Sequence, residues 1–284
     1  MANPASKRAL VTLSAMRPAT LEAAWRATAG VAPGTVFLFD FDGTLASISE
    51  DPDGVHPVAG AVEALRALAE AVGRVAIVSA RPADFLYSRL GALSDVDLYG
   101  LYGLEVRRAG AETVADPEAL AWLPVMREVV AAARAELPAG AGVEDKRLAV
   151  ALHWRSAPEA AETVEAWAAA RAARHGLRAQ AGRMVVELKP PVDRDKGWVV
   201  RDELDPGTEA VWYFGDDLAD LPAFAAITER ERADPGFLGF RIAVLNPETG
   251  AEVTAAADYT VDSPEALPAV LAAGIPVLRG RQLP

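Results

Sequence analysis

The sequence predicts an α/β protein in which a doubly wound parallel sheet forms the core and a smaller α+β domain is inserted into it. Short apolar runs of strand length alternate with segments of helical spacing toward both ends of the chain, as in parallel β-α-β units. Between them, the pattern changes to two helix–hairpin units. We therefore predict a discontinuous core of 1–108 and 190–284, in which 1–34 is an N-terminal extension, and a cap domain of 109–189.

The first half of the core begins with a short amphipathic segment at 20–28 and an apolar run, Thr35-Val-Phe-Leu-Phe. This run is short and aromatic, as is typical of a buried parallel strand. In 56–72 the apolar residues fall on one helical stripe. The remaining elements predicted here are a strand at 74–79, a helix at 82–90 and a strand at 96–101. This alternation predicts right-handed crossovers and a Rossmann-like sheet.

The middle of the chain departs from this alternation. Within 147–155 apolar residues alternate with smaller or polar ones, which predicts one buried and one more open strand face. We predict a helix at 118–137, a hairpin at 142–154, a helix at 158–175 and a hairpin at 177–189 that turns near Ala181-Gly182. The core then resumes with a helix from Lys196, strands at 210–214, 241–245 and 259–261, and a final helix at 265–273.

The composition narrows the classes of function. A net charge of −12 leaves no basic surplus to neutralise phosphates, so we predict no nucleic-acid and no membrane partner. The absence of cysteine excludes disulfides, thiolate catalysis and cysteine-ligated metal sites. There is no run of about 18 apolar residues to form a transmembrane helix, and polar residues interrupt the N-terminus where a signal peptide needs an apolar stretch. We expect a cytoplasmic protein.

Two carboxylates follow the first predicted strand, in Asp40-Phe-Asp42-Gly43-Thr44. Ligands of open α/β sheets bind beyond the carboxyl ends of the strands, so both carboxylates are expected to face one small site. One can attack phosphorus as a nucleophile while the other protonates the departing oxygen. Asp-rich turns contain the same pattern, but the apolar strand directly before Asp40 favours the catalytic interpretation.

A second acidic cluster, Gly215-Asp216-Asp217-Leu-Ala-Asp220, follows the strand predicted at 210–214. Alone it is compatible with a helix N-terminus. Close to Asp40, its oxygens would form a site for a hard cation, and magnesium fits because it keeps water and phosphate oxygens as ligands. Ser79, at the end of another strand, and Lys196, at the start of a helix, complete a predicted phosphate site at this edge of the sheet.

Four motifs together resemble those of haloacid dehalogenase phosphatases: Asp40-Phe-Asp-Gly-Thr-Leu, Ser79, Lys196 and Gly215-Asp-Asp-x-x-Asp220. The resemblance implies a phosphomonoester hydrolase that forms an aspartyl-phosphate on Asp40. Asp42 would act as general acid and then as the base for the hydrolytic water.

The same resemblance implies a metal site and a phosphate site. It places Mg²⁺ on Asp40, the carbonyl of Asp42 and Asp216, with Asp220 close by or behind them. It also implies that Thr44, Ser79 and Lys196 orient the phosphoryl group. The segment between Ser79 and Lys196 then corresponds to an α+β cap inserted between the second and third motifs.

Several stretches over about 36–262 resemble the trehalose-6-phosphate phosphatase family in particular. They are Val143-Glu-Asp-Lys146-Arg, Ala149-Val-Ala-Leu-His153-Trp-Arg155, Gly182-Arg-Met-Val-Val-Glu187-Leu-Lys, Asp193-Arg-Asp-Lys196-Gly and Gly215-Asp-Asp-Leu-Ala-Asp-Leu-Pro-Ala-Phe224. The resemblance implies a magnesium-dependent hydrolase of trehalose 6-phosphate in trehalose biosynthesis, served by a separate glycosyltransferase (synthase). It also implies that Glu144, Lys146 and Glu187 of the cap bind sugar hydroxyls, although Glu144 and Lys146 flank a hairpin turn and are equally explained as a solvated pair.

The sequence departs from the family pattern at Ala80, Tyr102, Ala219 and Leu221. Tyr102 stands where the family usually has His or Asn, in a loop that can shape the sugar pocket. Besides the cap residues, the expected substrate contacts are Thr44, Arg81, Tyr102 and Glu105. The alternative substrates are another phosphorylated disaccharide, a trehalose-like pseudo-disaccharide, sucrose phosphate or a glycosylglycerate phosphate. A further alternative is a catalytically silent domain that binds a sugar phosphate.

Overall fold

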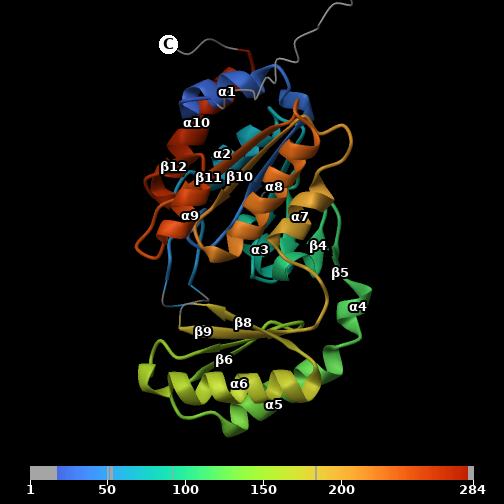
Figure 1. The fold of residues 1–284 in the computed structure, drawn as a ribbon, viewed down its shortest axis with the longest axis vertical. Helices are drawn as coiled ribbons and strands as arrows, with labels where there is room; N and C mark the ends of the chain where they lie inside the picture. Colours follow the sequence, from blue (N-terminus) through green and yellow to red (C-terminus); the bar gives the residue numbers. More distant parts are fainter. Residues whose placement is uncertain (1–17, 50, 52–53, 92, 183, 281–284) are drawn as a thin grey trace, which may run out of the picture.

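Two sheets organise the computed structural model, which describes residues 18–49, 51, 54–91, 93–182 and 184–280. The larger sheet has the strand order β12-β11-β10-β1-β2-β3-β4-β5, and the smaller has the order β6-β7-β9-β8. In Figure 1 the large sheet and its helices form the upper part of the molecule, and the small sheet with two helices forms the lower part. The predicted α/β core with an inserted α+β domain is confirmed.

Parallel strands form most of the large sheet, with β1 between β10 and β2. Their bounds are β1 (Thr35–Phe39), β2 (Arg74–Val78), β3 (Asp97–Gly100), β10 (Ala210–Gly215), β11 (Leu238–Val244) and β12 (Tyr259–Val261). In β1, β2, β10 and β11 the residues are mostly apolar and are buried on both faces, as expected where helices cover both sides of a sheet. Because parallel strands end at one edge, the loops that follow β1, β2 and β10 meet there.

Two short antiparallel strands, β4 (Glu105–Arg107) and β5 (Thr113–Ala115), extend the large sheet beyond β3. Neither was predicted, because three residues are too few to display a periodic pattern. The predicted cap boundary at 109 assigns β5 to the cap, whereas its backbone pairs with β4 in the core sheet. The crossing into the cap therefore follows β5.

Helices cover both faces of the large sheet. Along β1, Phe37 and Phe39 pack with α1 (Leu21–Ala29), α2 (Ala61–Ala69), α3 (Ala83–Leu90) and α10 (Leu267–Leu278). The alternate residues Val36 and Leu38 pack with α7 (Lys196–Glu203), α8 (Leu221–Ala233) and α9 (Ala251–Ala256). Of the helices in the described ranges, none is both long enough and apolar enough to cross a bilayer.

The last helix continues beyond its predicted end at 273, through Gly274 and Pro276, to Leu278. Glycine normally lowers helix stability, but here a Cβ on Gly274 would lie 2.3 Å from the ring of Trp25 in α1. The missing side chain lets α1 and α10 approach each other, and Trp25 stacks on Trp212 of β10 with ring centroids 4.2 Å apart. This part of the predicted N-terminal extension is thus packed on the core, while 1–17 lie outside the described residues.

The cap is the small sheet backed by two helices. Its elements are α4 (Pro117–Leu120), α5 (Leu123–Glu136), β6 (Gly142–Asp145), β7 (Val150–His153), α6 (Ala161–His175), β8 (Arg178–Gly182) and β9 (Val185–Lys189). Val150, Leu152 and Leu188 belong to the apolar cluster between the sheet and the helices. The hairpin predicted at 177–189 is formed by β8 and β9, and it reverses between Gly182 and Val185, directly after the predicted turn residues.

The chain crosses between core and cap at two neighbouring points. The first crossing, after β5, contains Asp116, and the second, before α7, contains Arg194. Arg194 Nη2 donates a hydrogen bond to Asp116 Oδ2 at 2.8 Å. The two crossings are thereby joined by an ion pair.

Candidate active site

Asp40 lies at the carboxyl end of β1 and is 5% exposed. Its backbone N–H donates to the carbonyl of Phe214 in the neighbouring strand, at 2.8 Å, so the sheet itself fixes its position. Lys196, the first residue of α7, places its Nζ 2.8 Å from Asp40 Oδ1 and 2.7 Å from Asp220 Oδ1. The predicted nucleophile and lysine are therefore brought together.

The charges in this group oppose one another strongly. Burial raises the pKa of Asp40 well above its usual range, as do the nearby acidic residues, while the Lys196 ammonium acts in the other direction. Burial lowers the pKa of Lys196, but the carboxylates of Asp220 and Asp40 outweigh it and raise that pKa well above its ordinary value. Lys196 is therefore a permanent cation at neutral pH.

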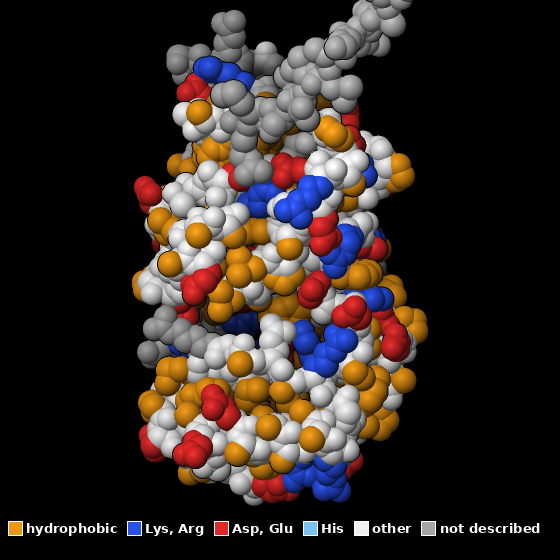
Figure 2. Space-filling view, viewed as in Figure 1, with side chains coloured by type: hydrophobic (Ala, Val, Ile, Leu, Met, Phe, Trp, Pro, Cys, Tyr) orange, Lys and Arg blue, Asp and Glu red, His pale blue; other side chains and the backbone are white. Residues whose placement is uncertain are grey.

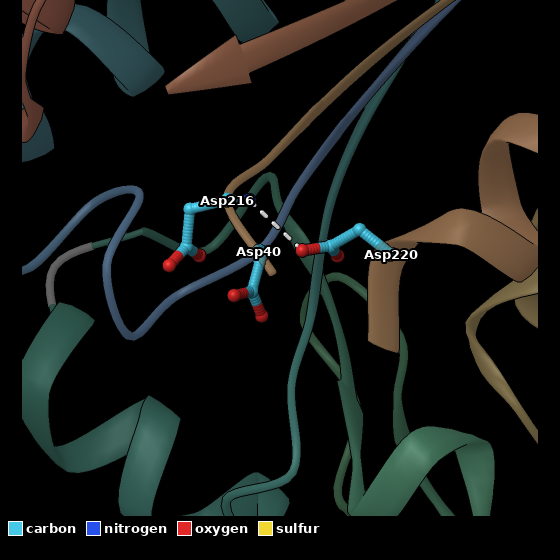
Figure 3. A group of neighbouring side chains, drawn as sticks. All are labelled: Asp40, Asp216 and Asp220. Carbon is cyan, nitrogen blue, oxygen red and sulfur yellow. Dashed lines mark hydrogen bonds between the residues drawn. The ribbon is translucent and has the colours of Figure 1, made fainter. Parts of the chain in front are cut away.

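Asp216 and Asp220 follow β10 and lie on either side of Asp40, as Figure 3 shows. The backbone N–H groups of Asp216 and Asp217 both donate to Asp220 Oδ2, at 2.9 and 3.1 Å. Asp220 Oδ1 accepts from Lys196 and from the hydroxyl of Tyr213. Both oxygens of Asp220 are thus engaged by protein donors, and Asp220 fixes the loop that presents Asp216.

Gly43 gives Asp216 the room to reach this place. It has φ +81°, and a Cβ there would lie 2.1 Å from Asp216 Oδ2. The two oxygens of Asp216 accept from Thr44 Oγ1 at 3.2 Å and from Asn246 Nδ2 at 2.8 Å. The predicted phosphate contact Thr44 is therefore also a hydrogen-bond donor that orients Asp216.

The residues present fit a divalent cation. Within the described ranges, Asp40, Asp216 and Asp220 each offer an oxygen, and these oxygens lie within 4.8 Å of one another. Burial, with the charges of Asp220 and Asp217, raises the pKa of Asp216 to about 7. Hard carboxylate oxygens are the donors that Mg²⁺ prefers, and a divalent cation would relieve this repulsion. Because Asp220 already accepts four hydrogen bonds, Asp40 and Asp216 are the better candidates for direct ligands.

We expect magnesium to stabilise the protein more at pH 8 than at pH 5.5. The folded-state pKa of Asp216 is raised to about 7 from 3.8, so between these values the folded state binds more protons than the unfolded state. The stability of the metal-free protein therefore falls as the pH rises through this window. Metal binding must release those protons, so it strengthens over the same window.

Thermal unfolding with magnesium and with a chelator, at both pH values, measures this effect. At a metal concentration of about 100 times the Kd, the added stability is about 2.7 kcal/mol, or a rise in Tm of roughly 5–10 °C for a chain of this size. Asp216→Asn should remove most of the metal effect, and Asp95→Asn, on an exposed loop, should not. A magnesium effect that is equal at both pH values in the unmodified protein would argue against Asp216 as a ligand.

Ser79 and Asp42 both accept hydrogen bonds from Arg81. The Ser79 hydroxyl accepts from the backbone N–H of Arg81 at 3.0 Å, and its side chain is buried at the end of β2. Asp42 is bound on both oxygens by Arg81, whose Nε lies 3.0 Å from Oδ2 and whose Nη2 lies 2.8 Å from Oδ1. The structure thus pairs Arg81, an expected substrate contact, with the expected general acid.

The cap turns a polar face toward this site. Glu144 pairs in register with Ala151, Ala151 with Glu187, and Glu187 with Gln180, so these four residues form one row across the sheet. Lys146 donates to Glu187 Oε1 at 2.8 Å and to the core carbonyl of Ala80 at 3.4 Å. The other oxygen of Glu187 is buried without a hydrogen-bond partner.

Tyr102 and Glu105 both lie where the core meets the cap. Tyr102 is in a left-handed conformation, its hydroxyl accepts from Gln180 Nε2 at 3.4 Å, and Lys189 Nζ lies 4.3 Å from its ring centre. Glu105 accepts from the first N–H of α3, at Ala83, and from Arg147 of the cap. Tyr102 thus faces the cap sheet, whereas both oxygens of Glu105 are engaged in holding α3 and the cap turn.

Several residues that contact the expected site residues were not predicted. Asn246, which donates to Asp216 and to the carbonyl of Gly43, follows β11; its position after a strand end was the available signal. Tyr213 lies inside β10 and Lys189 ends β9, where a strand pattern conceals any further role.

A cavity of about 740 Å³ opens beside Asn246. Core loops, including Ser47 and Glu265, and Arg155 of the cap line it. Arg155 Nη1 lies 3.4 Å from Glu248 of the core across this space. Figure 2 shows a recess where the two domains meet, with Lys or Arg side-chain atoms inside it.

Comparison with solved structures shows the same fold. The C-terminal domain of C. albicans trehalose-6-phosphate phosphatase matches with a TM-score of 0.71 at 21% identity, over 93% of this chain and 99% of that one. A haloacid dehalogenase-like hydrolase from Bacteroides thetaiotaomicron matches with a TM-score of 0.58 at 16% identity, over 84% of this chain and 98% of that one. The predicted core with an inserted cap is shared with both.

Sequence comparison identifies the family. A trehalose-phosphate phosphatase of Mycolicibacterium paratuberculosis is 38% identical over 80% of this chain and 58% of its own length. One from Mycobacterium tuberculosis is 37% identical over 87% of this chain and 63% of its own length, so the chain spans about three fifths of these relatives. The trehalose-phosphatase profile matches residues 38–265, a range that contains all four predicted phosphatase motifs. The predicted resemblance is confirmed: the chain belongs to the trehalose-phosphatase family.

Proposed function

We propose that this chain is a magnesium-dependent phosphatase that hydrolyses trehalose 6-phosphate to trehalose and phosphate. The observation that carries the proposal is the contact of Asp40 with Lys196, at 2.8 Å, beneath a cap that offers Glu187 with one buried oxygen lacking a partner. A nucleophile and a fixed cation serve phosphoryl transfer, and a carboxylate oxygen without a donor suits a sugar hydroxyl. The names of the sequence relatives support the same substrate.

The reaction divides into two displacements at phosphorus. In the first, an oxygen of Asp40 bonds to phosphorus, the ester P–O bond breaks, and the proton of Asp42 passes to the sugar oxygen. In the second, water attacks the phosphorus, Asp42 takes its proton, and the bond to Asp40 breaks to give phosphate. Lys196 and the Ser79 hydroxyl position the phosphoryl oxygens.

Asp40, the Asp42 carbonyl and Asp216 would hold Mg²⁺. When bound, it neutralises charge on the transferring phosphoryl group and fixes the direction of attack. Asp220 holds Lys196 and the Asp216 loop in place. Asn246 and Thr44 hold the carboxylate of Asp216.

The cap would recognise the sugar. Glu144, Lys146 and Glu187 lie on its core-facing side, and hydrogen bonds from charged groups to hydroxyls are strong. The cavity of about 740 Å³ beside the site has the size of typical small-molecule pockets. A separate synthase would supply the ester, and the cytoplasmic location stays a prediction.

A second candidate substrate is another phosphorylated disaccharide or a trehalose-like pseudo-disaccharide. Tyr102 favours this second candidate, because it replaces the usual family residue and its ring and hydroxyl contact Lys189 and Gln180 of the cap. At that position Tyr102 can change the shape of the sugar pocket. Sucrose phosphate and glycosylglycerate phosphates belong to the same class. A silent binding domain is disfavoured because binding alone needs no nucleophile paired with a lysine.

Phosphate release from trehalose 6-phosphate, beside glucose 6-phosphate and sucrose 6-phosphate, with magnesium and with chelator, tests the proposal. Selective, metal-dependent release from trehalose 6-phosphate is expected. Activity only on another ester would keep the Asp40 chemistry and reassign the substrate. No release from any ester would support the silent-domain alternative.

Glu187→Gln should raise KM for trehalose 6-phosphate by about tenfold or more, because it removes a charged acceptor from a sugar hydroxyl. It also removes the negative charge that lies 2.8 Å from the buried Lys146 ammonium, so a moderate loss of Tm is expected as well. Glu165→Gln, on the exposed side of α6, is the matched control. An unchanged KM in a folded Glu187→Gln protein would remove Glu187 from the substrate site.

A further inference from the structure

Two buried polar groups lie on opposite sides of the boundary between core and cap. Glu187 of β9 is 5% exposed, and one of its oxygens has no hydrogen-bond partner among the described residues. Tyr102 of the core is 9% exposed, and its hydroxyl accepts from Gln180 but finds no acceptor for its own proton in the same part of the chain. We propose that one sugar hydroxyl bridges the two, accepting from Tyr102 and donating to Glu187. The inference deepens the proposed function and rests on it, since it takes a sugar phosphate as the substrate.

The two groups are close to each other. Gln180 and Glu187 are directly paired residues of β8 and β9, so their side chains leave the same face of the sheet about 5 Å apart. The Tyr102 oxygen lies 3.4 Å from Gln180 Nε2, which places it beside this pair. Burial raises the pKa of Tyr102 well above its ordinary value, and Glu187 is the nearby charge that adds most to this rise. The Tyr102 hydroxyl therefore keeps its proton and lies near Glu187.

The hydrogen bonds around Tyr102 decide which groups its hydroxyl can still bind. The Lys189 ammonium has donors and no acceptor, and its Nζ lies 2.6 Å from Gln180 Oε1. This contact turns the other end of the amide, Nε2, toward Tyr102. Because Nε2 is a donor only, the Tyr102 oxygen must accept from it. The Tyr102 proton is thereby left for an acceptor outside this chain of hydrogen bonds.

Glu187 supplies the complementary half of the pair. Its Oε1 accepts from Lys146 at 2.8 Å, which orients the carboxylate and leaves Oε2 as an acceptor. A buried polar group without a partner is unfavourable, and a hydroxyl, which both donates and accepts, satisfies Glu187 and Tyr102 together. An ether oxygen or a fluorine only accepts, and an ammonium only donates, so none of them can replace the hydroxyl.

The backbone holds Tyr102 rigidly in this place. Leu101 and Tyr102 have left-handed φ values of 50° and 60°, which are unfavourable for bulky side chains. The N–H of Tyr102 donates to the carbonyl of Ser79 at 3.0 Å, and the N–H of Leu101 donates to that of Arg81 at 2.9 Å. Strain of this kind persists where the surrounding structure fixes it, often at binding sites. The strained turn thus ties the Tyr102 hydroxyl to the loop of Ser79, the expected phosphate contact.

The consequence is a selection for a hydroxyl at one position of the sugar. Tyr102 is the residue that would read this hydroxyl, and Gln180 and Lys189 are positioning residues that keep the Tyr102 proton available. The charges of Lys196 and Asp40 also act on the Tyr102 hydroxyl, so the group lies within reach of the reacting residues as well as of the cap. A sugar phosphate that lacks the hydroxyl would leave both Tyr102 and Glu187 without a partner.

Tyr102→Phe tests this, because it removes the hydroxyl and keeps the ring. The substrates are trehalose 6-phosphate and its monodeoxy and monodeoxyfluoro analogues. At one position, we expect the preference in kcat/KM for the parent over both analogues to be about tenfold smaller in Tyr102→Phe than in the unmodified enzyme, the size of one hydrogen bond. Equal loss on every ester would give Tyr102 a structural role only, and unchanged preferences at all positions would exclude a bond to the substrate; either overturns the proposal.

Two further variants test the pair and its positioning. Gln180→Glu keeps the shape of the side chain but offers Tyr102 an acceptor, which takes up the Tyr102 proton, so the same preference should fall; a normal preference would overturn the proposal. Glu187→Gln should reduce the preference at the same position, and its effect should not add to that of Tyr102→Phe; a loss at a different position would overturn the bridge. Tyr87→Phe, at an exposed tyrosine of α3, is the control that should retain every preference.

The unmodified enzyme separates the two hypotheses. If it hydrolyses another sugar phosphate and not trehalose 6-phosphate, the proposed substrate is wrong, and the deoxy series of that ester tests Tyr102 in its place. If it hydrolyses trehalose 6-phosphate while Tyr102→Phe keeps the preference at every position, only the inference about Tyr102 is wrong. Hydrolysis of no ester would overturn both.

Discussion

Asp40→Asn is expected to reduce kcat by at least about 10⁴-fold, because it removes the proposed nucleophile while the shape of the site is kept. The Tm should be retained or slightly raised. Burial and the neighbouring acids raise the pKa of Asp40, so its charge is disfavoured in the fold, and an amide removes that charge. Lys196 keeps its second carboxylate partner, Asp220.

Acid quenching during turnover of ³²P-labelled substrate measures the intermediate directly. The unmodified enzyme should carry label on protein, and Asp40→Asn should carry none. Asp95→Asn, a carboxylate-to-amide change on an exposed loop, should behave as the unmodified enzyme. Labelled protein, or full magnesium-dependent activity, from purified Asp40→Asn would assign the nucleophile to another residue.

Lys196→Met is expected to remove both activity and a large part of the stability. Lys196 is 3% exposed and contacts Asp40 and Asp220, and removal of one partner of a buried ion pair costs about 3–5 kcal/mol. Loss of the cation at the phosphate should lower kcat about 10³-fold or more. Chemical denaturation and steady-state kinetics measure the two effects.

The destabilisation by Lys196→Met should be larger at pH 8 than at pH 5.5. The Lys196 ammonium is what lowers the pKa of Asp40 against the effect of burial, so without it that pKa rises further, the folded state binds more protons than the unfolded state, and its stability falls as the pH rises. Asp220→Asn should partly restore stability in the double variant. Arg201→Gln, an exposed residue of the same helix, is the control; similar behaviour of the two variants would contradict the buried-pair explanation.

The strands that carry the site could be predicted because burial on both faces leaves a plain sequence signal. β1 is the apolar run that was expected, and the acidic motifs of Asp40 and Asp216 follow strand ends. β4 and β5 were missed because a strand of three residues at a sheet edge need not be apolar; Val114 is 66% exposed.

The contacts between side chains in the site were harder to predict from the sequence. The contact of Arg81 with Asp42 could not be predicted, because it depends on a rotamer and a loop path rather than on sequence spacing; the role of Arg81 as a substrate contact stays a prediction. Glu105 was expected in the pocket but holds the start of α3. Asn246 lies 30 residues after Asp216, its partner, and a single amide after a strand has no pattern of its own.

The Asp116–Arg194 ion pair suggests how the cap of such a fold can be exchanged. The chain leaves the core and returns to it at two points that are joined by a contact of 2.8 Å. The ends of the core segments therefore lie side by side, whatever segment connects them. A segment of another length can replace the cap without displacing any strand of the sheet, as in insertions between neighbouring chain ends. The acidic site at the strand ends of the core would then be kept, while the segment that covers it changes.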